Sequence, residues 1–224
     1  MAQRKPPRRT RERILETALA LFNRFGEPHV TTGDIADELN ISPGNLYYHF
    51  RNKDDIIGDL YAALEAKIAP LTAVPPDRAS NVDDLWLLLH LLFERTWEYR
   101  FFYRDLDEIT SRNRKVAQRF AAFNRRGEAT VIELCNGLVR SGAMRATERE
   151  IAALAQNVLM VATYWMSWQR ISGRLPAAEN TDAIADTRLA HAAYQAMALI
   201  TPYLQDEARE LIEHLGADYL RLAN

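Results

Sequence analysis

Helical periodicity interrupted by few glycines and prolines is the feature that most limits how this chain can fold. Only nine glycines and nine prolines occur in 224 residues, and they cluster between segments whose apolar residues recur every three or four positions. The first such segment carries Ile14, Ala18, Phe22 and Phe25 and stops at Gly26. No stretch of useful length alternates apolar and polar residues as a half-buried strand does. The sequence therefore predicts an all-α fold.

The same pattern divides the chain into three parts. Three short helices predict an N-terminal helix-turn-helix domain with a basic arm over residues 1–52. A connecting helix and a proline-rich linker occupy residues 53–81, and a larger helical ligand-binding and dimerisation domain is expected over residues 82–224. Individual helices are expected at residues 10–25, 32–39, 43–50, 53–69, 82–103, 105–111, 116–141, 147–173 and 183–200, with a last amphipathic segment near residues 211–220.

Several helix starts carry capping residues. Ser42 precedes Pro43, which suits the first position of a helix because no N–H is needed there. Asn52 precedes an acidic first turn. Thr147 with Glu150 three residues on has the spacing of a capping box.

Composition points to a cytoplasmic globular protein. Apolar residues make up 48% of the chain and charged residues 26%. The single cysteine, Cys135, leaves no intrachain disulfide and no thiolate metal cluster. The longest apolar run, from Leu85 to Phe93, is interrupted by His90 and is much shorter than the ~20 residues that span a bilayer. We expect no membrane association, no cofactor and no bound metal.

Charge is distributed unevenly along the chain. The first thirteen residues hold six basic side chains and one acidic one, a net charge of +5. The whole chain has a net charge of −2, so the remainder carries −7. A basic arm on an acidic body indicates that this end meets a polyanion, although a solvated tail would have the same composition.

The third predicted helix has two chemically different faces. Leu46 and Phe50, four residues apart, are expected to point inward. Gly44, Asn45, Tyr47 and Tyr48 then face outward on a rod about 12 Å long, which fits the major groove of B-DNA. An asparagine amide can pair with a base edge, while tyrosines offer flat faces and hydroxyls. The alternative is that the tyrosines pack between helices.

Residues flanking that helix extend the predicted surface. His49 and Lys53 lie at its edge, and Lys53 begins the next helix, where a cation and free N–H groups could converge on one phosphate. Thr31 and Thr32 open the second helix and could bind phosphate or simply cap the helix.

The runs TTGDIA at residues 31–36 and ISPGNLYYHFRNK at residues 41–53 resemble the DNA-binding domain of the TetR/AcrR family of bacterial regulators. The resemblance is strong over residues 9–64 and only architectural beyond them. It implies a homodimer that places two recognition helices in successive major grooves of a near-palindromic operator. Gly33 departs from the longer polar residue that many relatives have, so base recognition would rest on the third helix, and on the basic arm if it reaches the adjacent groove. The candidate DNA-contacting residues are Thr31, Thr32, Gly33, Pro43, Gly44, Asn45, Tyr47, Tyr48, His49 and Lys53.

The predicted C-terminal domain, residues 82–224, is rich in aromatic residues and contains all four tryptophans. Two sets of residues at helical spacing suit an apolar pocket: one is Trp86, His90, Phe93 and Trp97, and the other is Met160, Tyr164 and Trp168. Core packing is the default interpretation for any single one of these side chains. The candidate ligand-binding residues are Trp86, His90, Phe93, Trp97, Phe102, Met160, Tyr164 and Trp168. By resemblance, this domain encloses a pocket for a small apolar or aromatic inducer. Its last two long helices, at residues 148–173 and 183–200, pair with those of a second copy.

The resemblance also suggests a mechanism. Inducer binding would favour a dimer whose recognition helices are wrongly spaced for the operator, with the fourth helix as the lever. Repression is the usual mode of the family.

Two other function classes compete with a DNA-binding regulator. No glycine-rich phosphate loop, zinc-protease helix or nucleophile elbow supports an enzyme. The pairs His90/Glu94 and His214/Asp218 have metal-ligand spacing but no further ligands. A module that binds only proteins would not need the basic arm or the exposed tyrosines.

Overall fold

The computed structural model describes residues 7–73, 75, 77–173 and 185–222. Within these residues the fold is all-α, as predicted, with no strand and one isolated bridge between Met144 and Leu204. The expected start of the helix at Ala183 and the arm residues Arg4 and Lys5 lie outside the described residues. The α-helices are α1 Pro7–Phe25, α2 Thr32–Glu38, α3 Pro43–His49, α4 Lys53–Ile68, α5 Val82–Glu98, α6 Arg100–Arg104, α7 Leu106–Arg112, α8 Arg114–Arg140, α9 Glu148–Ile171, α10 Ala185–Ile200 and α11 Asp206–Leu222.

The N-terminal helices begin where the capping residues predicted them. Thr31 forms a capping box with Asp34 at the start of α2. The Ser42 side chain accepts the backbone N–H of Asn45 at the start of α3. Asn40 at φ 55° makes the turn between α2 and α3, in the left-handed region that asparagine tolerates. These short-range contacts fix α3 against α2.

The long helix predicted at residues 82–103 is wrong, because it is two helices. α5 ends at Glu98, and Tyr99, at φ −111° and ψ 36°, separates it from α6. Asn23 of α1 takes over the hydrogen bonds at the break. Its amide donates to the Glu98 carbonyl at 2.8 Å and accepts the Phe101 N–H at 3.0 Å. A side chain from 75 residues away thus replaces helical hydrogen bonds.

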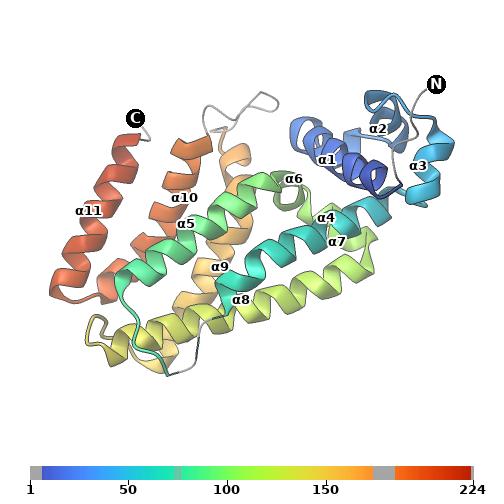
Figure 1. Ribbon diagram of the computed structural model, residues 1–224. Coiled ribbons are helices and arrows are strands. Elements are labelled where there is room, and N and C mark those ends of the chain that lie inside the picture. Colours follow the sequence, from blue (N-terminus) through green and yellow to red (C-terminus); the bar gives the residue numbers. More distant parts are fainter. Residues whose placement is uncertain (1–6, 74, 76, 174–184, 223–224) are drawn as a thin grey trace.

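The C-terminal helices follow the predicted order. α8 ends at Arg140, and Gly142 at φ 79° makes the turn. The capping box of Thr147 and Glu150 opens α9, as predicted. α10 packs against α5, α9 and α11, and α11 forms the outer edge of this end of the molecule (Figure 1).

The buried apolar residues form two clusters. One lies among α5, the C-terminal half of α8, α9 and α10. The other lies among α1–α4 and also contains residues of α6, α7 and the start of α8. Phe22 of α1 lies 5.2 Å from Phe101, and Tyr61 of α4 lies 4.8 Å from Phe102, between ring centroids. The N-terminal helices are therefore anchored to α6 by aromatic packing.

Among the described residues, no helix combines the length and apolarity that crossing a membrane requires.

Candidate nucleic-acid interface and internal cavity

The two faces of α3 differ as the sequence predicted. Leu46 is 0% exposed and Phe50 3%, whereas Tyr47 is 52% and Tyr48 78% exposed. Gly44 and Asn45 are also exposed. α3 lies at the outer edge of the N-terminal end, away from the C-terminal helices (Figure 1). Two buried side chains thus hold a short helix whose opposite side presents an amide and two phenols.

The predicted residues around this face are arranged by local contacts. The Tyr47 hydroxyl lies 3.0 Å from the Thr32 hydroxyl, which joins the outward face of α3 to the start of α2. The Tyr48 ring meets the His49 ring edge-on at 5.1 Å. Gly33 is partly exposed, and Pro43 is exposed.

Thr31 is occupied by capping. Its hydroxyl donates to the Asp34 carboxylate at 2.7 Å and accepts the Asp34 N–H at 3.2 Å. Hydrogen bonds from the Thr31 backbone and side chain lower the pKa of Asp34. The capping interpretation of Thr31 is therefore seen directly. A phosphate contact would require the Thr31 hydroxyl or N–H to release Asp34, because both donors are already used.

The Lys53 ammonium points into the protein. It forms an ion pair with Glu27 at 2.7 Å and donates to the backbone carbonyls of Glu27 and Val30 at 2.9 and 3.0 Å. In this arrangement the ammonium is not available for the phosphate contact predicted for it. Of the predicted phosphate contact, only the part made by the backbone N–H groups at the start of α4 is compatible with this geometry.

Glu27 is the centre of a charge cluster between the N-terminal helices and α7. Its side chain is completely buried and also pairs with Arg112 of α7 at 2.8 Å. Arg112 reaches Asp54 at the start of α4 at 2.9 Å. Burial acts to lower the pKa of Arg112, but the carboxylates of Asp54 and Glu27 together outweigh it and raise that pKa. One arginine thus joins α7 to both the α1–α2 connection and α4.

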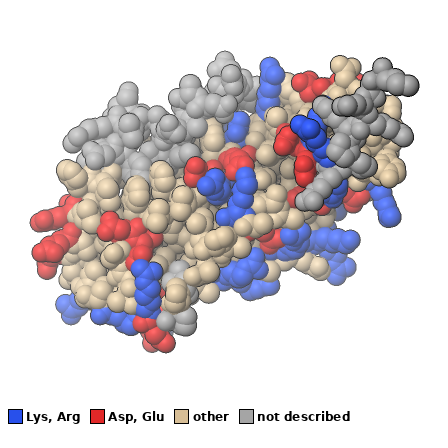
Figure 2. Space-filling model, viewed as in Figure 1, with Lys and Arg blue, Asp and Glu red and all other residues tan. Residues whose placement is uncertain are grey.

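A second set of contacts joins α6 to the end of α1. Arg104 donates to the Phe22 carbonyl at 2.7 Å, and Asp105 accepts the Glu27 N–H at 3.0 Å. Basic side chains also gather along the lower right of the molecule in Figure 2, where α7 and the first half of α8 run in Figure 1. On α8, Arg119 and Arg126 both pair with Glu65 of α4.

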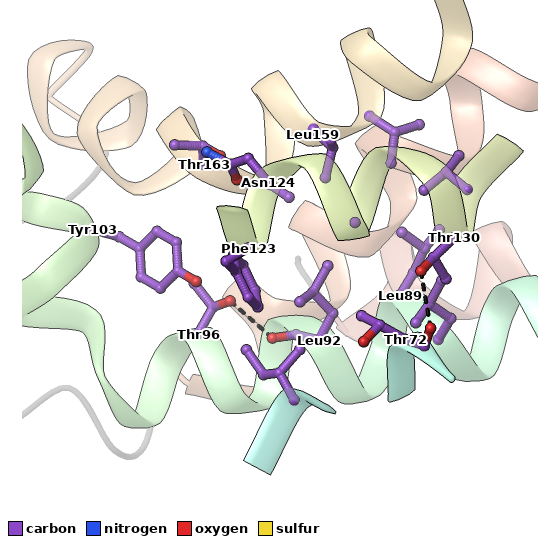
Figure 3. A pocket seen from close by; sticks show the side chains of 16 residues that line it. Thr72, Leu89, Leu92, Thr96, Tyr103, Phe123, Asn124, Thr130, Leu159 and Thr163 are labelled. Carbon is purple, nitrogen blue, oxygen red and sulfur yellow. Dashed lines mark hydrogen bonds between the residues drawn. The ribbon is translucent and has the colours of Figure 1, made fainter. Parts of the chain in front are cut away.

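An internal cavity of about 30 Å³ lies among α4, α5, α6, α8 and α9 (Figure 3). Its apolar lining includes Ile68, Leu88, Leu89, Leu92, Val158 and Leu159. Its polar lining consists of Thr72, Thr96, Tyr103, Asn124, Thr130 and Thr163. Within the described part of the chain, no Asp, Glu, Lys, Arg or His side chain lines it.

None of the eight predicted ligand-binding residues lines this cavity. Phe93 and Phe102 are buried in the two apolar clusters. Trp86 stacks on His90 with ring centroids 5.1 Å apart, and Arg100 lies over Trp97 at 5.1 Å. The remaining three are exposed on one side of α9: Met160, Tyr164 and Trp168.

The helices that line the cavity include those proposed from the sequence, but they present other residues. α5 turns Leu88, Leu92 and Thr96 toward the cavity in place of the Trp86 and Phe93 face. Tyr103, which sequence reasoning did not select, lies on the short helix α6 that the break at Tyr99 creates. No local pattern marks it, because its position depends on a contact from α1.

No group of three or more His, Cys, Asp or Glu side chains that could hold a metal occurs among the described residues.

Two family models match the chain. The model of the N-terminal domain of bacterial regulatory proteins of the tetR family covers residues 14–60. The model described as bacterial transcriptional repressor, TetR, covers residues 63–212. Together the two models cover residues 14–60 and 63–212, which include both the N-terminal and the C-terminal helices.

Similar proteins give the same picture. A solved TetR-family regulator from Marinobacter aquaeolei VT8 is 34% identical, superimposes with a TM-score of 0.83, and is matched over 94% of this chain and 98% of its own. The HTH-type transcriptional regulator AcrR of Shigella flexneri is 30% identical over 96 residues, which is 41% of this chain and 44% of AcrR. The match thus covers less than half the length of that curated relative. SmeT, solved in complex with triclosan, shares the fold at 18% identity, with a TM-score of 0.57 over 89% of this chain and 94% of its own.

Proposed function

The chain belongs to the TetR family of bacterial transcriptional regulators, and we propose that it is a cytoplasmic, ligand-responsive repressor that binds a near-palindromic operator as a homodimer. The observation that carries the proposal is the outward face of α3. There Tyr47 and Tyr48 are exposed while Leu46 and Phe50 fix the helix from behind. A short helix of this width enters the major groove, where Asn45 can pair with a base edge.

A second exposed surface supports the homodimer. Met160, Tyr164 and Trp168 recur every four residues on α9 and are 58%, 47% and 57% exposed, and Ile171 continues the stripe at 76%. A contiguous apolar stripe of this kind marks an interaction site. We propose that α9 and the neighbouring α10 pair with their symmetry mates in a four-helix arrangement.

The cavity is the proposed effector site. It lies among α4, α5, α6, α8 and α9, and regulators of the same fold were solved with triclosan and with choline. Tyr103 of α6 lines it, while the next two residues, Arg104 and Asp105, hold the end of α1 and the Glu27 backbone. An effector that enlarges the cavity would shift α6 and, with α4, change the spacing of the two recognition helices. Operator affinity then falls by the effector's differential affinity for the two states.

In vitro selection from a random duplex DNA pool tests the DNA-binding part even though the operator sequence is unknown. We expect the purified protein to enrich a motif with two related half-sites. Its affinity should fall steeply as salt rises, because lysine and arginine contacts release counterions from phosphate. Enrichment of no motif, at low ionic strength and with a folded dimer, contradicts the proposal.

A further inference from the structure

Four of the six polar residues that line the cavity lie toward one end. Figure 3 shows Tyr103, Thr96, Asn124 and Thr163 on the side away from Leu89, with Phe123 between the two ends. At the opposite end the polar groups bind one another, because the Thr130 hydroxyl reaches the carbonyls of Thr72 and Arg126 at 3.2 and 2.8 Å. The cavity therefore has one end with hydrogen-bonding groups to offer and one that is apolar in effect.

None of the described residues that line the cavity carries a charge. An ion that entered would lose its hydration and find no opposite charge, which costs several kcal/mol or shifts its protonation toward the neutral form. Arg126, next to the lining residue Gly127 in the sequence, is itself exposed and paired with Glu65.

The hydroxyls at the polar end are suited to a neutral hydrogen-bonding group. The Thr96 hydroxyl donates to the Leu92 carbonyl at 2.8 Å, which leaves its oxygen able to accept. Burial raises the pKa of Tyr103 to about 12, although a side-chain hydrogen bond with Thr96 acts in the lowering direction. The phenol therefore stays protonated at neutral pH and has an O–H to donate, and a ligand at this end would bind beside the Tyr103–Thr96 pair. Asn124 adds an amide that both donates and accepts.

We propose that the effector is an uncharged, mostly apolar molecule carrying a hydroxyl or similar group, which hydrogen-bonds to Tyr103, Thr96 and Asn124 while its apolar body lies against Leu88, Leu89 and Leu159. This inference rests on the proposed function, since it names the class of molecule that the regulator's cavity takes. The cavity of about 30 Å³ has room for only one or two waters, so the ligand binds by pushing the walls apart.

Four probes with one naphthalene body test the class: 1-naphthol, naphthalene, 1-naphthoate and 1-naphthylmethylammonium. Equilibrium dialysis gives the dissociation constant of each. We expect 1-naphthol to bind tightest and naphthalene roughly five- to tenfold more weakly, the effect of one hydrogen bond. Both ions should bind at least tenfold more weakly than 1-naphthol.

Two cavity variants locate the hydrogen bond. Tyr103→Phe and Asn124→Leu should each reduce the ratio between naphthalene and 1-naphthol dissociation constants, while naphthalene affinity stays within twofold and so reports an intact cavity. Tyr203→Phe, a matched change at a tyrosine outside the lining, should leave the ratio unchanged. An unchanged ratio in both cavity variants overturns the inference, as does tighter binding of either ion or failure of all four probes to bind.

Duplex selection on the same preparations, without probe, separates this inference from the proposed function. If the protein still enriches a paired half-site but prefers an ionic probe, only the proposal of an uncharged ligand is refuted. If the wild-type protein enriches no motif, the proposed DNA-binding function is refuted, whichever probes bind.

Discussion

Tyr48 is the most exposed aromatic side chain on α3, at 78%, and its ring meets the neighbouring His49 ring edge-on. Replacing it with alanine should therefore weaken operator binding by ~1–3 kcal/mol without changing the dimer. Titration of a labelled selected operator with wild-type protein and Tyr48→Ala measures this. Leu87→Ala, which removes a side chain 49% exposed on α5, is the control and should bind as wild type does. Unchanged affinity in Tyr48→Ala would mean that α3 does not face the DNA.

Cys135 illustrates a residue whose chemistry is suppressed by its surroundings. It is completely buried, and burial raises the pKa of its thiol to about 11. We expect iodoacetamide at pH 8 to leave the folded protein unmodified and to label Cys135 fully in denaturant, as followed by mass spectrometry. Rapid labelling of the native protein would show that the core around α8 opens.

Single residues also show where prediction from sequence succeeds and where it stops. The faces of α3 could be predicted because Leu46 and Phe50 lie four residues apart on a helix bounded by a cap and a turn. The partner of Lys53 could not, because it is a buried carboxylate 26 residues away, brought there by the packing of α4. Local spacing carries no information on such a contact.

At the scale of helices, the same distinction explains the cavity. For the described helices, existence and order follow from periodicity and caps. The break at Tyr99 was missed, because the side chain that hydrogen-bonds across it, Asn23, comes from α1. α5 is apolar nearly all round, so its sequence does not say which stripe faces the cavity. The structure turns Leu88 and Leu92 inward and leaves Trp86 to pack at the edge of the core.

The cluster around Glu27 allows a prediction about how elements are coupled. Its completely buried carboxylate is shared by Lys53 of α4 and Arg112 of α7. Lys53→Met and Arg112→Met should each lower the free energy of unfolding by ~1–2 kcal/mol, because the other cation still neutralises Glu27. The double variant should lose about 1 kcal/mol more than the two single losses combined, because it leaves a buried charge unpaired.

Urea denaturation measures these free energies. All variants are compared at one fixed protein concentration, because the apparent stability of a dimer depends on that concentration. Arg78→Met breaks the exposed pair with Asp84 and should cost less than ~1 kcal/mol. Additive losses in the Lys53 and Arg112 variants would indicate that the two cations act independently and that Glu27 does not couple α4 to α7.

For the whole molecule, the decisive surface is the apolar stripe on α9 formed by Met160, Tyr164, Trp168 and Ile171. The sequence selected three of these residues, yet as pocket lining, because helical spacing identifies a face without saying whether ligand, core or a second copy covers it. In the isolated chain the stripe is open to solvent. Covering it in a symmetric pair would remove that exposed apolar area from water, at roughly 25 cal/mol per Å².

Placing a carboxylate at the centre of the stripe should prevent that pairing. We expect Trp168→Glu to sediment as a monomer at micromolar concentrations while keeping its helical circular dichroism, because a charge buried across the two-fold axis would face its own copy. Leu87→Glu, on the exposed side of α5, should remain dimeric. Since two half-sites are bound together only by a dimer, the variant should lose at least tenfold in affinity for the paired operator and little for a single half-site. A Trp168→Glu protein that stays dimeric would place the partner elsewhere, and the apolar side of α9 would then need a different occupant.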